Sequence, residues 1–245
     1  MSVNILLSGS AGRMGRSITE ISEDNGCHIS CPIDVGDDPI QGINDCDVVI
    51  DFSLREATLP LARLCVDAGK PMVIGTTGHG QAEKSEIESF SSKIPIVWAG
   101  NFSTGVNLLF YITEIAARVL DSSSKFDPEV IEMHHRLKKD SPSGTADRLL
   151  EILKNSRELT DKQIAHGRNG MVGERPAKEI GSHALRGGDV VGDHTVLFAG
   201  MGERIELTHR ATDRKIFAVG ALRAAKWIRD QPPGLFSMQD VLGLV

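Results

Sequence analysis

The fold of the first part of the chain is decided by the stretch Val3-Asn-Ile-Leu-Leu-Ser8-Gly9-Ser-Ala-Gly12-Arg13-Met14-Gly15. The apolar run over 3–8 is typical of a buried parallel strand, and the apolar spacing over 13–22 predicts a helix. The glycines between them follow the spacing GxxGxxG. Glycine lets the backbone approach a pyrophosphate, and free N–H groups at the helix start attract its negative charge. The stretch therefore predicts a dinucleotide-binding turn, with a tight turn without ligand as the alternative.

Strand and helix alternate through about residue 100. Further strands are expected over 28–33, 47–52, 71–74 and 95–98, and further helices over 57–68 and 81–90. Such alternation forms βαβ units. It predicts an α/β fold whose N-terminal part is a Rossmann-type doubly wound parallel sheet with helices on both faces.

The pattern changes after residue 103. An amphipathic helix is expected over 104–120, strands over 177–185, 192–199 and 204–208, and a last helix over 217–228. The strands alternate apolar and polar residues and are separated by glycine-rich turns. They predict an α+β C-terminal domain with an open mixed sheet.

Asp34 follows the second predicted strand, where a carboxylate binds the adenosine ribose of NAD. A solvated turn residue is the alternative interpretation. Arg13, on the glycine loop, would instead pair with the 2′-phosphate of NADP. The sequence thus predicts NADH and/or NADPH as cofactor without choosing between them.

Two more loops follow predicted strands: Gly75-Thr76-Thr77-Gly78 and Ala99-Gly100-Asn101-Phe102. Ligands of open α/β sheets bind at the carboxyl edge of the strands, which is where these loops are expected. The amide of Asn101 suits a carboxamide such as that of nicotinamide. Each loop alone is typical of plain turn chemistry, and the three together favour a cofactor site.

A second group of polar residues lies in Glu132-Met-His134-His135-Arg136-Leu-Lys138-Lys139-Asp140-Ser-Pro142-Ser143-Gly144-Thr145-Ala146. The apolar pair Val130 and Ile131 before it predicts a strand, and the stretch 146–153 at its end predicts a helix. His134 and His135 should point to opposite faces, since side chains alternate along a strand. The positive charge nearby favours anions and lowers the pKa of a neighbouring imidazole or ammonium, which suits Lys138 as a proton donor.

The Ser-Gly-Thr turn after Pro142 begins the next helix, with Ser143 or Thr145 as its N-cap. Free N–H groups of Gly144 and Thr145 would bind a carboxylate as a helix start binds phosphate. An ordinary capped helix is the alternative. Beside the His-His-x-x-Lys set, the turn predicts a binding site for a small carboxylate substrate.

Bulk properties exclude other classes of protein. A net charge of −6 without a long basic run argues against nucleic-acid binding. The N-terminus lacks the features of a signal peptide and no apolar run is long enough to span a membrane, so we expect a cytoplasmic protein. The chain has four cysteines, at Cys27, Cys31, Cys46 and Cys65. None has a metal-binding spacing, so we expect reduced thiols and predict no metal site.

Taken together, the motifs resemble the 4-hydroxy-tetrahydrodipicolinate reductase (dihydrodipicolinate reductase) family nearly end to end. Beside Glu132–Ala146, the matching stretches are Gly9–Gly15, Val49–Phe52, Gly75–Gly78, Asn101–Asn107, Arg186–Thr195 and Gly202–His209. The chain departs from some members where Val35 replaces an arginine after Asp34, which argues against strong NADP selectivity. His79 and Gly80 stand where an aromatic and an acidic residue are expected.

The resemblance implies reduction of 4-hydroxy-tetrahydrodipicolinate to tetrahydrodipicolinate with NAD(P)H, in lysine and diaminopimelate biosynthesis. His134 would be proton donor and acceptor, Lys138 proton donor, and His135, Gly144 and Thr145 would bind the dicarboxylate. The cofactor would be bound by Gly9, Ser10, Ala11, Gly12, Arg13, Met14, Asp34, Gly75, Thr76, Thr77, Ala99, Gly100, Asn101 and Phe102.

The resemblance further implies a discontinuous dinucleotide-binding domain over 1–102 and 216–245, and a substrate-binding and oligomerisation domain over 103–215 that forms a homotetramer. Another NAD(P)-dependent amino- or keto-acid dehydrogenase is the alternative enzyme. A nucleotide-sensing regulator is the alternative from a different class. It would need a DNA- or protein-binding module, and the sequence has no recognisable helix-turn-helix.

Overall fold

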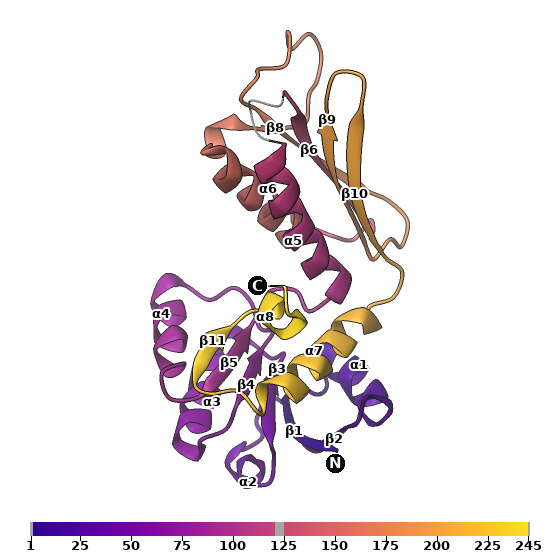
Figure 1. Cartoon of the computed structure of the whole chain (residues 1–245). Helices are drawn as coiled ribbons and strands as arrows, with labels where there is room; N and C mark the ends of the chain where they lie inside the picture. The colour runs from indigo at the N-terminus through magenta and orange to yellow at the C-terminus, as the bar shows by residue number, and fades with distance from the viewer. Residues whose placement is uncertain (1, 121–124, 245) are drawn as a thin grey trace. The chain divides into compact units, whose positions relative to one another are not determined.

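The computed structural model describes residues 2–120 and 125–244. Residues 1, 121–124 and 245, which fall within the predicted domains, lie outside the described part. The chain divides into two compact units (Figure 1). The first comprises Met1–Thr104 and Arg214–Val245, and the second Gly105–Asp213.

The first unit contains a parallel sheet with the strand order β11-β5-β4-β3-β1-β2. Its strands are β1 (Val3–Ser8), β2 (Cys27–Ile33), β3 (Val48–Asp51), β4 (Met72–Ile74), β5 (Pro95–Trp98) and β11 (Gly234–Phe236). The order reverses direction between β1 and β3, as in a doubly wound fold. The predicted Rossmann-type sheet is thus confirmed, and β11 adds an edge strand that the sequence did not predict.

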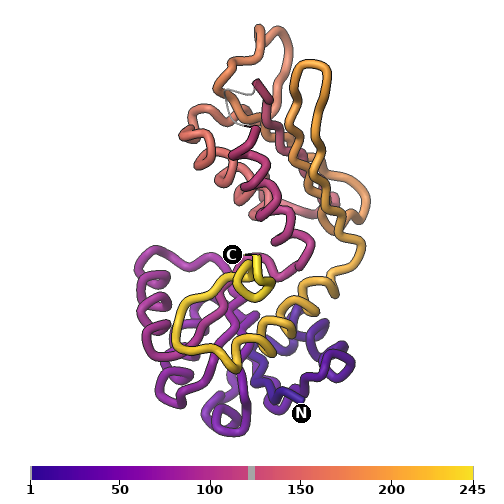
Figure 2. The backbone as a smooth tube through the Cα atoms, viewed as in Figure 1, coloured from indigo at the N-terminus to yellow at the C-terminus, as the bar shows by residue number. Residues whose placement is uncertain are grey.

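Helices cover both faces of this sheet. They are α1 (Arg13–Ile21), α7 (Lys215–Ile228) and α8 (Met238–Leu242) on one face, and α2 (Ile40–Ile43), α3 (Arg55–Ala68) and α4 (Gln81–Phe90) on the other, with a short 3-10 helix η1 (Glu23–Asn25) after α1. Successive residues of β1 serve the two cores: Ile5 and Leu7 pack with α7, and Leu6 packs with α3. The last helix, α7, lies beside the first, α1 (Figures 1 and 2).

The second unit is an open mixed sheet with the order β10-β9-β6-β8-β7. Its strands are β6 (Asp127–His134), β7 (Ile164–His166), β8 (Ile180–Arg186), β9 (Gly192–Ala199) and β10 (Arg204–Ala211); the helices are α5 (Thr104–Val119), α6 (Gly144–Arg157) and the 3-10 helix η3 (Asp161–Gln163). Strand β6 pairs in parallel with β8 and antiparallel with β9. Helices α5 and α6 pack on one face, and the predicted α+β fold is confirmed.

The side chains of strand β6 alternate between the two faces of this sheet. Val130, Glu132 and His134 alternate along it and are buried, with Val130 in the core that α5 and α6 cover. Ile131 points to the opposite face and is 37% exposed. Glu132 and His134 therefore lie two residues apart on one face, where their side chains meet.

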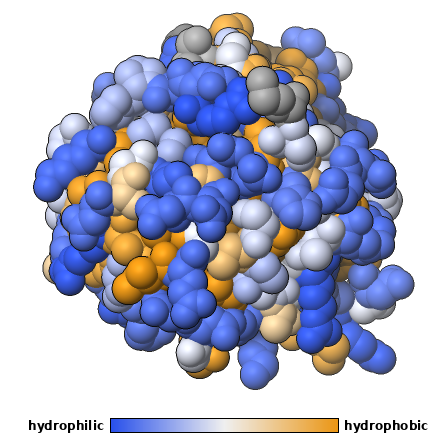
Figure 3. Space-filling model, turned by 90° about the horizontal axis from the view of Figure 1, so that it is seen from below, coloured by the Kyte–Doolittle hydropathy of each residue, from blue (hydrophilic) through white to orange (hydrophobic). Residues whose placement is uncertain are grey.

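The molecular surface is mainly polar in the view of Figure 3, where apolar side chains form separate small areas among hydrophilic ones. Among the described helices, none combines the length and the apolar character that crossing a membrane requires.

Candidate active site

The glycine loop after β1 is built for close backbone contact. Gly9 has φ +79°, and a Cβ atom there would lie 2.3 Å from the carbonyl oxygen of Phe52. A Cβ on Gly15 would lie 2.2 Å from the carbonyl oxygen of Gly9. Both glycines are thus required by the packing of the turn itself. Gly12, Arg13 and Ala11 are exposed, so the outer side of the turn is open to a ligand.

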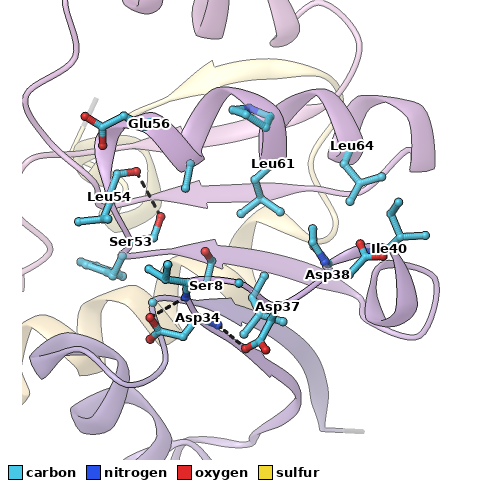
Figure 4. Close-up of a pocket in the computed structure, with 18 of the residues that line it drawn as sticks. Ser8, Asp34, Asp37, Asp38, Ile40, Ser53, Leu54, Glu56, Leu61 and Leu64 are labelled. Atoms are coloured by element: carbon cyan, nitrogen blue, oxygen red, sulfur yellow. Dashed lines mark hydrogen bonds between the residues drawn. The ribbon is translucent and has the colours of Figure 1, made fainter.

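A cavity of about 960 Å³ lies in the first unit beside this loop (Figure 4). Its lining combines residues after β1 (Gly9, Gly12), after β2 (Asp34) and after β3 (Phe52–Leu54). This is the point at which the strand order reverses, where open α/β sheets bind their ligands. The sequence reasoning missed Phe52–Leu54, although the same edge rule, applied to the strand before them, predicts a ligand-facing loop there.

Asp34 joins the glycine loop directly. Its Oδ2 accepts a hydrogen bond of 2.8 Å from the Ala11 N–H, and its Oδ1 accepts one of 2.8 Å from the Val35 N–H. These two backbone donors lower the pKa of Asp34, so the group is a carboxylate at neutral pH. The structure therefore places the Asp34 carboxylate directly beside the glycine turn.

The two other predicted loops follow β4 and β5 at the same edge, outside the lining of this cavity. Thr76 Oγ1 accepts a hydrogen bond of 3.0 Å from the Ser53 N–H, so the loop after β4 is fastened to the loop after β3. Asn101 Oδ1 accepts one of 2.9 Å from the Ser103 N–H. Phe102 is buried in the core, with its ring 5.3 Å from that of Phe52.

The remaining predicted cofactor residues lie in the same loops. Ser10 and Met14 are half-buried beside the glycine turn. Gly75 leaves no room for a side chain, because a Cβ there would lie 2.2 Å from the Phe52 ring. Thr77 and Gly100 are exposed.

His79, which the sequence left unexplained, lies in the loop between β4 and α4. It is buried, and its ring packs edge-to-face on Trp98 with centroids 5.5 Å apart. It thus makes the contact that an aromatic residue would make here. Gly80 is the N-cap of α4, and its N–H donates to Glu83 over 2.6 Å.

In the second unit, His134 ends strand β6 and is 8% exposed. Its Nδ1 forms a short hydrogen bond with a carboxylate oxygen of Glu132. Burial lowers the pKa of His134, with smaller contributions in the same direction from Lys138 and Arg186, while Glu132 opposes the change. From the sequence, we expected the nearby positive charges to lower the pKa of an imidazole here. In the structure, burial is the larger cause of the lowered pKa of His134.

Lys138 lies in the loop after β6, with its side chain 19% exposed and its Nζ 2.8 Å from Asp140 Oδ2. This ammonium lowers the pKa of Asp140 through the hydrogen bond. The Lys138 N–H donates to the carbonyl oxygen of His135 over 3.1 Å, which closes a turn beside the half-buried His135. The arginine and lysine at 136 and 139 are exposed.

Helix α6 begins at the predicted turn. Ser143 is the N-cap, and its Oγ accepts a hydrogen bond of 3.2 Å from the Ala146 N–H. Gly144 is exposed, and a Cβ atom there would meet nothing within 4 Å. Thr145 follows it and is half-buried. The first turn of α6 thus opens on free space at Gly144, as a ligand-binding helix start requires.

His194 on β9 was not predicted as a site residue. It is 3% exposed, its Nε2 lies 3.1 Å from Ser143 Oγ, and its ring lies edge-on to that of His134 with centroids 5.1 Å apart. Burial lowers its pKa to about 4, so the imidazole is neutral at pH 7. Strand pairing places it opposite Glu132, a relationship that local spacing does not reveal.

Donor atoms of Glu132, His134 and His194 lie within 4.8 Å of one another, a spacing that suits a metal ion. The guanidinium of Arg186, however, donates to both oxygens of Glu132, over 2.9 and 3.1 Å. A cation there would face that positive charge and compete for oxygens already used. We assign no metal to these residues.

Two family models match consecutive parts of the chain. Residues 3–102 match the N-terminus of dihydrodipicolinate reductase, and residues 105–242 match its C-terminus. The chain belongs to the dihydrodipicolinate reductase family. It is an NAD(P)H-dependent oxidoreductase, and the predicted family and enzyme class are confirmed.

Curated relatives cover the same length. The chain is 50% identical to the 4-hydroxy-tetrahydrodipicolinate reductase of Akkermansia muciniphila, over 99% of this chain and 98% of the relative. It is 46% identical to that of Chromobacterium violaceum, over the full length of both. Among solved structures, a dipicolinate-bound dihydrodipicolinate reductase from Paenisporosarcina sp. TG-14 shares the fold, with a TM-score of 0.75 and 22% identity over 98% of this chain and 99% of that one.

Proposed function

We propose that the chain reduces 4-hydroxy-tetrahydrodipicolinate to tetrahydrodipicolinate with NAD(P)H, and that His134 and Lys138 manage the protons. The reduction is the activity of the family to which the chain belongs. It replaces a hydroxyl group by hydrogen, and so consumes one hydride and one proton and releases one water. The observation that carries the assignment of roles is the buried Glu132–His134 pair beside Lys138 and the open start of α6.

The first unit has the features that a dinucleotide requires. The cavity at the reversal of strand order provides the space, the exposed side of the glycine turn provides backbone N–H groups, and Asp34 provides an acceptor for a ribose hydroxyl. A bound nicotinamide supplies the hydride. We therefore assign cofactor binding to the discontinuous first unit, with Gly9–Met14 and Asp34 at the adenosine and pyrophosphate end.

The second unit has the features that a dicarboxylate requires. The N–H groups of Gly144 and Thr145 at the start of α6 would hold one carboxylate, helped by the positive end of the helix dipole. His135, half-buried in the adjoining loop, would hold substrate as well. The ammonium of Lys138 would donate the proton that the reduction consumes. His134, neutral at pH 7 because burial lowers its pKa, would accept or return a proton.

The test of this assignment is Lys138→Ala. Removal of the ammonium should lower kcat by ~10²-fold or more, as expected for the loss of a general acid, while the affinity for NADH stays at the wild-type value. The matched control is Lys139→Ala, one residue further along the same loop and exposed. Wild-type turnover in Lys138→Ala, measured by NADH oxidation with substrate generated in situ, would remove Lys138 from the mechanism.

We also propose that the enzyme assembles through the second unit and works in the cytoplasm. The face of its sheet away from α5 and α6 carries Ile131 and Leu185, which are 37% and 47% exposed. Apolar side chains on an uncovered sheet face are typical of an assembly surface.

The free thiols at Cys27, Cys31, Cys46 and Cys65 are consistent with a reducing compartment.

A further inference from the structure

One carboxylate connects the segments of the second unit to which we assign chemistry. Glu132 is 2% exposed, and its side chain accepts hydrogen bonds from three places. These are His134 Nδ1, the backbone N–H of Ser143 over 3.0 Å, and the guanidinium of Arg186. Strand β6, the N-cap of α6 and strand β8 are thus held at one point.

Arg186 extends this connection to the loop that carries Lys138. Its Nη2 donates to the carbonyl oxygen of Asp140 over 2.7 Å, while the same nitrogen donates to Glu132 over 2.9 Å. Asp140 in turn holds the Lys138 ammonium through its side chain. The position of the ammonium therefore depends on the Glu132–Arg186 pair through two consecutive contacts.

The same carboxylate fixes the protonation pattern of His134. Arg186 and His134 lower the pKa of Glu132 against the effect of burial, so Glu132 is ionised and can only accept hydrogen bonds. The hydrogen of a neutral His134 must then lie on Nδ1, which leaves Nε2 as the nitrogen that exchanges protons. Nε2 faces Gly192, where an added Cβ atom would lie only 3.0 Å away. Glycine at this position keeps the space beside Nε2 open.

We propose that Glu132 and Arg186 form a positioning pair, which sets the Nδ1–H tautomer of His134 and holds both the start of α6 and the Lys138 loop in place for the reaction. Its two side chains are assigned to positioning other groups and not to contact with a reacting atom. This inference rests on the proposed role of His134. It adds the reason why the His134 imidazole has its orientation. Carboxylates that orient a catalytic imidazole act in the same way in hydrolases.

Four charged or titratable groups face His134, and they determine how its titration responds to a substitution. Glu132 raises the pKa of His134, whereas Lys138, Arg186 and the neighbouring His194 do not stabilise its charged form. Replacing the carboxylate of Glu132 by an amide removes the one group that favours the imidazolium. The inflection of the pH profile that belongs to His134 should therefore move to lower pH.

The experiment compares Glu132→Gln with Glu129→Gln. Glu129 lies on the same strand, is also an ion-paired carboxylate, and binds Arg168, Arg175 and His183 on the other face of the sheet. We expect Glu132→Gln to lower kcat by at least ~10-fold, as for other disturbed tautomers, to shift the pH profile of kcat/KM to lower pH, and to leave the affinity for NADH unchanged. Glu129→Gln should affect thermal stability without moving the pH profile.

A pH profile and kcat in Glu132→Gln equal to those of the wild type would overturn the proposal. A direct measurement on the wild-type enzyme guards against a variant that does not fold. ¹⁵N chemical shifts of the His134 ring, assigned by comparison with His134→Ala, should report hydrogen on Nδ1, and hydrogen on Nε2 would contradict us. Full activity in His134→Ala would instead refute the proposed function, so the two failures are distinguishable.

Discussion

At the scale of single residues, Gly144 is proposed to bind the substrate, and the packing around it does not require a glycine. An added Cβ atom meets nothing within 4 Å, and the residue begins helix α6 after the Ser143 N-cap. We predict that Gly144→Ala leaves the thermal unfolding midpoint unchanged or slightly raised, because alanine favours helix. The methyl group would enter the space in which the proposed carboxylate binds. KM for the substrate should therefore rise by about tenfold or more, equivalent to a lost hydrogen bond to a charged group.

The matched control for this prediction is Gly80→Ala, which alters the start of α4 in the first unit. It should leave KM for the dicarboxylate unchanged. Steady-state kinetics and thermal unfolding on both variants check the prediction. An unchanged KM in Gly144→Ala would remove the start of α6 from the substrate site.

Only part of the candidate site could be predicted from the sequence. His134, Lys138 and Gly144 lie within eleven positions of one another, so local spacing was enough to single them out. Glu132 belongs to the same stretch, yet its role depends on Arg186, which is 54 positions away in sequence. His194 reaches Ser143 across 51 positions. Partners that strand pairing brings together leave no periodic signal in one sequence.

At the scale of elements, the acidic residues that follow β2 lead to a prediction about the choice between NADH and NADPH. Asp34, Asp37, Asp38 and Glu56 all line the cavity. In Figure 4, Asp34 and Asp37 lie near each other, Asp38 lies beside Ile40, and Glu56 lies on the opposite side, beyond Leu54. Arg63 also lines it, but its guanidinium is paired with Glu86. The arginine at position 13, which the sequence suggested as a partner for the 2′-phosphate of NADP, is not among the lining residues. A 2′-phosphate would enter a negative field here.

We predict that NADH binds at least ~10-fold more tightly than NADPH, because like charges near a 2′-phosphate cost more than 1.4 kcal/mol in a partly enclosed site. Isothermal titration with both cofactors measures the ratio. In the double variant Asp34→Asn, Asp37→Asn the ratio should fall, mostly through tighter NADPH binding. Equal affinities in the wild-type protein would show that the acidic lining does not control the choice.

Element boundaries were predicted well where the periodicity was strong. Strand β1 was expected over 3–8 and spans Val3–Ser8, and β9 was expected over 192–199 and spans Gly192–Ala199. The missed strands are β7 (Ile164–His166) and β11 (Gly234–Phe236), each of three residues. Three residues cannot display a repeat, and β11 follows two prolines that indicate a turn. Such strands form because a neighbouring strand offers its edge.

At the scale of the whole molecule, the uncovered face of the second unit leads to a prediction about assembly. Ile131 is paired with Thr195 and stands on the face opposite the helices. We predict that Ile131→Asp dissociates the proposed homotetramer into smaller species, because burying an unpaired carboxylate at an interface costs several kcal/mol. Sedimentation velocity measures the change. Leu235→Asp, which places the same charge at an exposed position of β11, is the control and should leave the oligomer intact.

The chain completes its first unit last. Helix α7 supplies Ala218, Ala221 and Leu222 to the core shared with β1 and β3, and Gly220 allows it to approach the backbone of Phe102, where an added Cβ would lie 1.7 Å from the carbonyl oxygen. During synthesis, five strands of the parallel sheet emerge from the ribosome before this helix exists. The face of the sheet that α7 covers therefore lacks this helix while residues 105–213 are translated. The second unit is continuous in sequence and can fold during that interval. A chain that ends at residue 213 would therefore contain a complete second unit joined to an incomplete first unit that is prone to aggregate.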